Sequence, residues 1–142
     1  MMTMSKEENI ALVRRFFSVG PSGGDLTSTD ELLSSNLVLH VPLASSPGIQ
    51  GMNEIISACR AAFEHLDVTL DDMVAEGDRV AVRFTARGVH QGAFMGLPAT
   101  GKSITMTGIE IFRIEDGRVA ELWGEANLLG LMQQLGIVPA VS

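Results

Sequence analysis

The sequence has few basic residues, one cysteine, no tyrosine and no long apolar run. Its formal net charge is −7, which disfavours a nucleic-acid partner because contact with phosphates requires a basic surface. The single cysteine, Cys59, excludes a disulfide within the chain and makes the cytoplasm the expected compartment. No stretch approaches the roughly 20 consecutive apolar residues that cross a bilayer, and the N-terminus lacks the pattern of a secretion signal, so no membrane partner is expected.

The sequence also lacks the common signatures of metal, cofactor and nucleophile chemistry. It contains no phosphate-binding glycine loop, no dinucleotide fingerprint and no GxSxG nucleophile elbow. The three histidines are scattered without metal-ligand spacing. Cys59 has apolar neighbours at helical spacing, which predicts a buried structural thiol rather than a catalytic one. We therefore expect neither a metal nor a cofactor.

Length and composition indicate a single folded domain over residues 1–142. Apolar residues make up 46% of the 142 residues, which is enough for a hydrophobic core without covalent cross-links.

Hydrophobic periodicity and turn signals predict helices first and strands afterwards. Helices are expected at about 5–19, with a capping box formed by Ser5 and Glu8, and at about 28–33 and 52–65. Strands are expected at about 37–41, 68–75, 79–90, 103–114 and 118–125, followed by a short helix. This order indicates a segregated α+β fold, in which a bent, mainly antiparallel sheet wraps around helices and leaves a cavity between the layers.

The strand at 79–90 alternates clearly. Its apolar set and His90 share one face, whereas Arg79, Arg83 and Arg87 share the other. We interpret the arginines as a solvated or dimer-facing row.

Three segments carry a resemblance to a known family: 88–101 (GVHQGAFMGLPATG), 108–123 (GIEIFRIEDGRVAELW) and 128–136 (LLGLMQQLG). They resemble the SnoaL-like polyketide cyclases of the nuclear transport factor 2-like superfamily, and residues 14–17, 30–33 and 74–82 extend the resemblance over nearly the whole chain. The resemblance implies a cone-shaped α+β barrel, in which a curved sheet is closed by helices around an apolar pocket. It also implies a homodimer, which we expect to form through the sheet.

The same resemblance implies an activity. Cyclases of this type close a ring by intramolecular aldol condensation without metal or cofactor, and an aspartate acts as general acid and base. In relatives this aspartate commonly lies four residues after a tryptophan. Here Trp123 is followed at that distance by Asn127, which does not exchange protons near neutral pH. Glu110 stands where many relatives carry histidine.

Two carboxylates are candidates for the acid and base role. Glu110 shares strand parity with apolar residues, and burial there would raise its pKa and make it a usable base. The alternative is that it pairs with an arginine of a neighbouring strand. Glu125 could take over the role of the missing aspartate, or it could be an exposed charge at the end of a strand. Glu121 is predicted to be a cross-strand ion-pair partner.

Asn127, His90 and His40 are the candidates for holding a developing oxyanion. Each has an alternative role: Asn127 could cap the last helix, and His90 could make a structural hydrogen bond at the rim. The parity of His40 allows it to face either the pocket or solvent. His65 is expected at a helix end, where it would complement the helix dipole.

A further set of large apolar residues could form the pocket wall or could be plain core: Trp123, Phe84, Phe94, Met95, Met106 and Phe112.

The leading hypothesis is therefore a cofactor-free enzyme of the polyketide-cyclase type, which moves a proton next to a carbonyl in a small hydrophobic molecule, a polyketide or another carbonyl compound. One alternative is a non-catalytic binding protein with the same pocket. Another is an isomerase or an epoxide hydrolase of the same superfamily.

Overall fold

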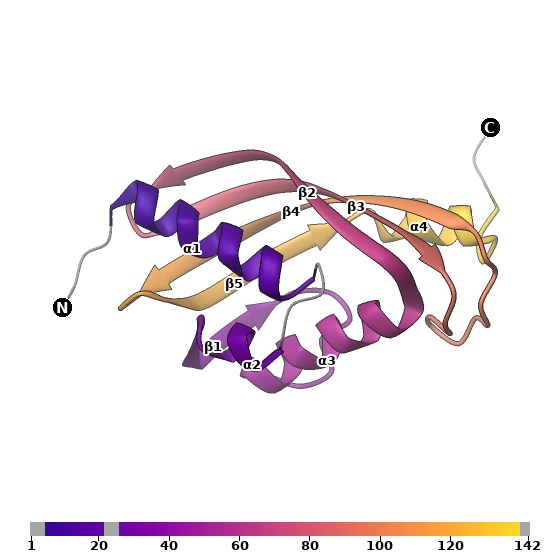
Figure 1. Ribbon diagram of the computed structural model, residues 1–142, viewed down its shortest axis with the longest axis horizontal. Coiled ribbons are helices and arrows are strands. Elements are labelled where there is room, and N and C mark those ends of the chain that lie inside the picture. The colour runs from indigo at the N-terminus through magenta and orange to yellow at the C-terminus, as the bar shows by residue number, and fades with distance from the viewer. Residues whose placement is uncertain (1–4, 22–25, 140–142) are drawn as a thin grey trace.

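The computed structural model describes residues 5–21 and 26–139 (Figure 1). Residues 20–24, whose Gly and Pro content predicts a loop, lie largely outside this range. Two helices come first, α1 (Lys6–Val19) and α2 (Leu26–Asp30), followed by strand β1 (Leu33–His40) and helix α3 (Gly48–Ala62). The remaining elements are β2 (Phe63–Glu76), β3 (Arg79–His90), β4 (Ser103–Glu115), β5 (Arg118–Ala126) and α4 (Leu128–Leu135). The predicted order of helices and strands is confirmed.

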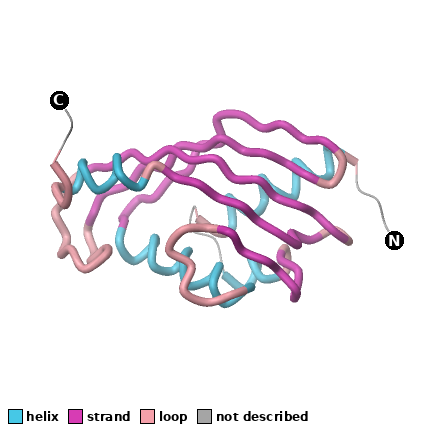
Figure 2. Tube along the Cα trace, turned by 180° about the vertical axis from the view of Figure 1, so that it is seen from behind, coloured by secondary structure: helices cyan, strands magenta, loops and turns pink. Residues whose placement is uncertain are grey.

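The strands form one curved five-stranded sheet in the order β1-β5-β4-β3-β2. β1 runs parallel to β5, and the other neighbours pair antiparallel. Figures 1 and 2 show α1 and α3 on the same side of this sheet, and α4 near the end where β5 finishes. We call the side covered by α1 and α3 the inner face, and the opposite side the outer face.

Helix α1 begins with the predicted capping box. The backbone N–H of Glu8 donates to Ser5 Oγ at 3.1 Å, and the backbone N–H of Ser5 donates to Glu8 Oε1 at 3.0 Å. One side of the helix then packs on the inner face of the sheet through Val13, Phe16 and Phe17, all of which are buried. The cap and this apolar stripe together explain why α1 forms where it does.

The boundary between α3 and β2 differs from the prediction. The helix ends at Ala62 rather than at His65, because Phe63 and Glu64 pair with His90 and Val89 of β3 and so belong to the sheet. His65 lies on β2 with a φ of +55°, so the helix-dipole role expected for it is wrong.

The alternation predicted for 79–90 is confirmed. Val80, Val82 and Phe84 are buried against the helices, whereas Arg83 and Arg87 are exposed on the outer face.

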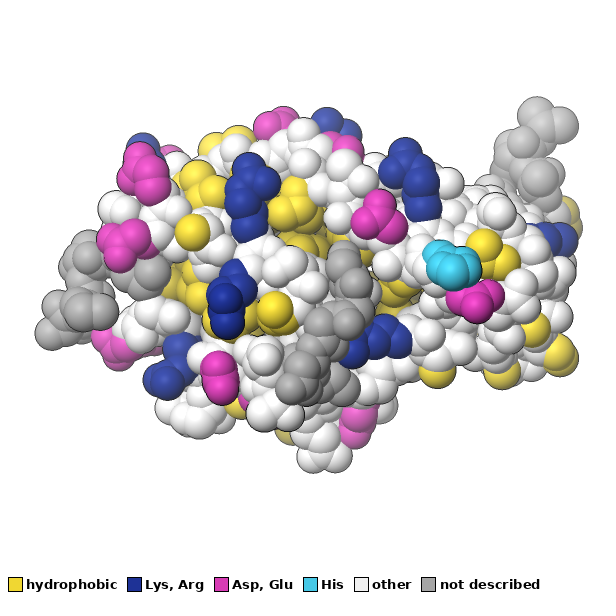
Figure 3. Space-filling model, in the orientation of Figure 1, with side chains coloured by type: hydrophobic (Ala, Val, Ile, Leu, Met, Phe, Trp, Pro, Cys, Tyr) yellow, Lys and Arg dark blue, Asp and Glu magenta, His cyan; other side chains and the backbone are white. Residues whose placement is uncertain are grey.

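The buried residues form two clusters on the inner face. The larger one joins α1 and α3 to the middle of the sheet, and the smaller one joins α4 to Phe63, Phe94 and Ile104. On the helix-covered side in Figure 3, acidic and basic side chains are mixed, and hydrophobic side chains are visible between them. No described helix has the length and apolar character that crossing a bilayer requires.

Candidate functional site

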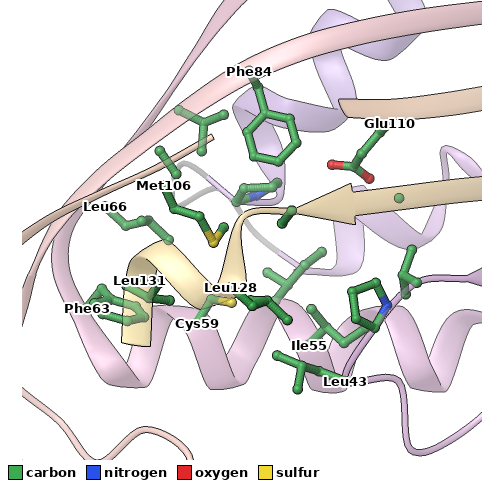
Figure 4. Close-up of a pocket in the computed structure, with 18 of the residues that line it drawn as sticks. Leu43, Ile55, Cys59, Phe63, Leu66, Phe84, Met106, Glu110, Leu128 and Leu131 are labelled. Carbon is green, nitrogen blue, oxygen red and sulfur yellow. The ribbon is translucent and has the colours of Figure 1, made fainter. Parts of the chain in front are cut away.

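A cavity of about 170 Å³ opens on the inner face. The sheet supplies one wall, and α1, α3 and the start of α4 supply the others. Its lining includes residues of both apolar clusters, so the cavity lies where the two clusters meet. In Figure 4, Phe84 and Glu110 reach in from the sheet, and Ile55 and Cys59 reach in from α3.

Glu110 is the polar group that matters most in this cavity. Its side chain is half-buried in the lining, and no described residue forms a hydrogen bond or an ion pair with it. Burial among apolar groups raises its pKa from the ordinary value to about 7. Its cross-strand neighbours are Val82 and Gly124, so the alternative of an arginine partner is wrong.

Two glycines leave room in the sheet wall of the cavity, Gly124 for Glu110 and Gly108 for Phe84. A Cβ on Gly124 would lie 3.0 Å from Val41 Cγ1 and 3.4 Å from Glu110 Cγ. A Cβ on Gly108 would lie 2.5 Å from Cζ of Phe84, whose ring packs over the bare backbone. Sequence reasoning gave neither glycine a role in the site, although a glycine inside a strand often marks close approach of another group.

Cys59 lies on the cavity wall and is half-buried, so the prediction of a core thiol is only partly right. Its pKa is raised by burial and by the nearby charge of Glu110. A raised pKa keeps the thiol protonated, and a protonated thiol is a poor nucleophile. This pKa direction favours the structural role expected for Cys59, which stays a prediction.

The rim of the cavity is formed by the segment after β1, which includes Pro42 and Leu43. Leu43 is 49% exposed and has a φ of +71°. The following residues are fastened to α3, because the hydroxyls of Ser45 and Ser46 donate to the carboxylate of Glu54 at 3.0 and 3.1 Å. These bonds hold the rim in place. The Ser, Gly and Pro content of residues 43–51 predicts a loop and does not indicate this role at the rim.

The other side of the rim is positioned by Arg60 of α3. Its guanidinium donates to the backbone carbonyls of Val19 and Gly20. These bonds fix the end of α1 beside Pro21, which belongs to the lining.

Glu125 and Trp123 do not share the inner face with Glu110. Both follow the strand parity opposite to Gly124, and Glu125 is exposed where it borders the cavity. Trp123 lies on the outer face, stacked on His40 with ring centroids 5.3 Å apart and with the Arg79 guanidinium 5.0 Å from its ring. The pocket-wall position predicted for Trp123 is therefore wrong.

His40 also belongs to the outer face. Its Nε2 lies 2.7 Å from Glu121 Oε2, and Arg113 Nε donates to the other oxygen of that carboxylate at 3.1 Å. The ion-pair role predicted for Glu121 is confirmed. Ile109 and Ile111 are exposed on the same face, which is where we expect a second copy of the chain to pack. The homodimer stays a prediction.

The remaining wall candidates divide into two groups. Phe84, Phe94 and Met106 line the cavity as predicted. Phe112 does not, because it is fully buried between Phe16 and Phe17, at centroid distances of 5.5 and 5.8 Å. Met95 is 52% exposed in the connection between β3 and β4.

None of the three groups predicted to hold an oxyanion lines the cavity. His90 is fully buried, and its Nδ1 accepts from the backbone N–H of Thr100 at 3.2 Å. Asn127 caps α4 by accepting from the backbone N–H of Gly130 at 2.9 Å. His40 lies on the outer face. For Asn127 the structure therefore shows the helix-capping alternative, and for His90 it shows a structural hydrogen bond.

Solved structures give similar folds over most of the chain. TsrD from Streptomyces laurentii is 35% identical, with a TM-score of 0.86 and coverage of 95% of this chain and 99% of that one. AclR from Streptomyces galilaeus, a proposed hydroxylase, is 30% identical, with a TM-score of 0.86 and coverage of 97% and 87%. IdmH from Streptomyces antibioticus, a proposed polyketide cyclase, is 32% identical, with a TM-score of 0.76 and coverage of 94% and 99%.

No curated protein sequence matches the chain significantly. The family model for the SnoaL-like polyketide cyclases, however, matches residues 11–135. The resemblance noted in the sequence and the α+β fold expected from it are thereby confirmed. This chain belongs to the SnoaL-like polyketide cyclase family.

Proposed function

We propose that this chain is a cofactor-free enzyme that uses Glu110 as an acid and base next to a carbonyl group of an apolar substrate. The observation that carries the proposal is the unpartnered carboxylate of Glu110 in the wall of an apolar cavity. A base is most effective when its pKa lies near the working pH, and the pKa of Glu110 is about 7.

The reaction we propose is an intramolecular aldol cyclisation or a related proton transfer. The Glu110 carboxylate removes a proton from the carbon beside one carbonyl, and the resulting enolate carbon attacks a second carbonyl of the same molecule. A carbon–carbon bond forms, and the electron pair of the attacked C=O moves to its oxygen. Glu110 then returns the proton to that oxygen. One carboxyl group thus serves first as base and then as acid, and no electrons are gained or lost.

The apolar walls contribute by position and by exclusion of water. Phe84 lies against Gly108 in the sheet wall, and Ile55 and Leu128 border the cavity from α3 and α4. Such walls can hold a folded substrate with its reacting carbons close together. They also keep water from competing for the enolate.

The substitution Glu110→Gln tests the proposal. We expect it to lower kcat by about 10²- to 10⁴-fold, the usual contribution of an acid and base group, while the circular dichroism spectrum stays that of the wild type. Glu121→Gln on the outer face is the matched control, and we expect it to change kcat less than about twofold, as is usual for a surface substitution. Turnover by Glu110→Gln at the wild-type rate would contradict the assignment.

A second candidate is a non-catalytic binding protein with the same cavity. The observation in its favour is that Asn127, at the position where the family resemblance implies an aspartate, is occupied in capping α4. Tight binding of a carbonyl compound without any conversion, in wild type and in Asn127→Asp alike, would support this candidate. An epoxide hydrolase is less well supported, because no arginine is found among the described residues that line the cavity.

A further inference from the structure

The lining of the cavity is almost entirely apolar. Apart from Glu110, the thiol of Cys59 and the exposed Glu125, every described side chain in the lining is apolar. A ligand that fills the cavity therefore meets one strong hydrogen-bonding side chain. Ligand selection by this cavity rests on the proposed function only in taking the cavity as the ligand site.

The sheet, α1 and the segment after β1 present no charged side chain to Glu110, so the bound ligand determines which protonation state of Glu110 is favoured. From the sheet it meets Val82 of β3 and Gly124 of β5, and from α1 the cavity receives Phe17. The segment after β1 contributes Val41 and Pro42.

Helix α3 adds the one further titratable group that acts on this site among the described residues, the thiol of Cys59. The side chain of Glu125 follows the opposite strand parity, and Asn127 is engaged in its cap. No described cation is placed to neutralise a second negative charge beside Glu110.

We propose that the cavity binds uncharged ligands through a single polar contact with Glu110, that a simple ketone binds only to its carboxylic acid form, and that a hydroxyl compound binds to both forms. A ketone oxygen only accepts hydrogen bonds, so it needs the O–H of the acid. A hydroxyl group can accept from the acid or donate to the carboxylate. A ligand carboxylate would place in an apolar site a charge with no described cation beside it, and a second charge where Glu110 is ionised; both are unfavourable.

This selection defines the substrate more closely. The proposed base step uses the carboxylate form of Glu110, which repels a bare ketone oxygen. A productive substrate must then present hydrogen to Glu110, as an enolic O–H, a hydroxyl group or the reacting C–H. A simple ketone of suitable size is expected to act as an inhibitor that weakens as the pH rises.

Three one-ring probes test the proposal: acetophenone, phenol and benzoate. They share an aromatic body, and an apolar cavity of about 150 Å³ is known to hold benzene, so a ring fits the 170 Å³ available here. Binding is measured by NMR titration of the methyl group of Met106, which lies in the lining. The measurement needs no turnover, so it stands apart from the test of the proposed activity.

For acetophenone we expect an apparent Kd that is constant at low pH and rises about tenfold per pH unit above the pKa of Glu110, because only the acid form is competent. The Kd of phenol should stay within about threefold until phenol itself ionises near pH 10. Benzoate should bind at least about tenfold more weakly than acetophenone at neutral pH, because its charge is not compensated in the cavity.

Glu110→Gln is the decisive variant, because its amide both donates and accepts at every pH. It should bind acetophenone with no pH dependence. The proposal is overturned if the wild type binds acetophenone equally well at low and high pH, if benzoate binds as tightly as acetophenone, or if no probe shifts the Met106 resonance.

Discussion

Two glutamates on adjacent strands have opposite surroundings. Glu110 on β4 faces inward, has no described partner and has a pKa raised by burial to about 7. Glu121 on β5 faces outward, and the pKa of its carboxyl is lowered by the hydrogen bond from His40 and then by Arg113. Both residues are glutamates, so the opposite shifts of their pKa values come from the face of the sheet on which each one lies.

The comparison shows why a missing partner can be informative. A protein stabilises an ordinary carboxylate with hydrogen bonds or cations, as it does for Glu121. Leaving Glu110 unpaired in an apolar wall costs stability, and such a cost is common at functional sites. Two glycines, Gly124 opposite Glu110 on β5 and Gly108 two residues before it on β4, give up strand stability in the same region.

The largest expected difference between the two glutamates lies in the pH dependence of stability. Because the folded-state pKa of Glu110 is raised, its contribution to stability is fully present below its ordinary pKa and is lost as the pH rises through about 7. The shift corresponds to about 3 kcal/mol of unfolding free energy. Urea denaturation of the wild type should therefore show a free energy of unfolding that falls between a pH below the ordinary glutamate pKa and a pH above about 7. Glu110→Gln should not show this fall.

The pH dependence that Glu121 contributes to stability has the opposite sign, and Glu121→Gln removes it. Its lowered pKa contributes stability above the ordinary glutamate pKa, and this contribution is lost as the pH falls through the lowered value. We expect this variant to keep the wild-type loss of stability near neutral pH. A wild type and a Glu110→Gln variant with parallel pH profiles would contradict the account of the inner glutamate.

Gly124→Ala tests how tightly Glu110 is positioned, and we expect it to have a smaller effect. The added methyl group would crowd Val41 and Glu110, and the side chains must move by a few tenths of an ångström to relieve the contact. Small displacements of a catalytic group are costly, so we expect kcat/KM to fall about tenfold. Thr107→Ala, on the exposed outer side of β4, is the control and should leave kcat/KM unchanged. Equal effects of the two substitutions would argue against a tightly positioned Glu110.

His40→Ala should have the smallest effect. It removes the stack on Trp123 and the 2.7 Å contact with Glu121, but His40 is exposed, and exposed pairs of this kind contribute about 1 kcal/mol or less. The melting temperature should fall slightly, and the affinity for acetophenone should not change. A marked loss of affinity would show that the outer face communicates with the cavity.

The fold was largely predictable because periodicity and turn chemistry act locally. The β3 alternation and the α1 capping box follow from residues close together in the sequence. The boundary at Ala62 did not follow, because it depends on pairing of Phe63 with the distant His90.

The site was only partly predictable. Strand parity placed Glu110 with Met106 correctly, because both lie on one strand. Parity also grouped Trp123 with Glu121 and Glu125, but it did not show which face was inner. The apolar character of Trp123 suggested the pocket, whereas the inner set of β5 contains Leu122 and Gly124. The rim residue Leu43 escaped notice, since its place depends on how the loop is fastened to Glu54.

The most direct test of the central claim is a pH titration of the glutamate side-chain carboxyl carbons by NMR, with the Glu110 signal assigned from Glu110→Gln and the Glu121 signal from Glu121→Gln. The account predicts that Glu110 titrates near pH 7 and that Glu121 titrates below the ordinary glutamate value. A Glu110 signal that titrates at the ordinary value of about 4.3 would contradict the claim that the inner face holds a carboxyl group ready to move a proton.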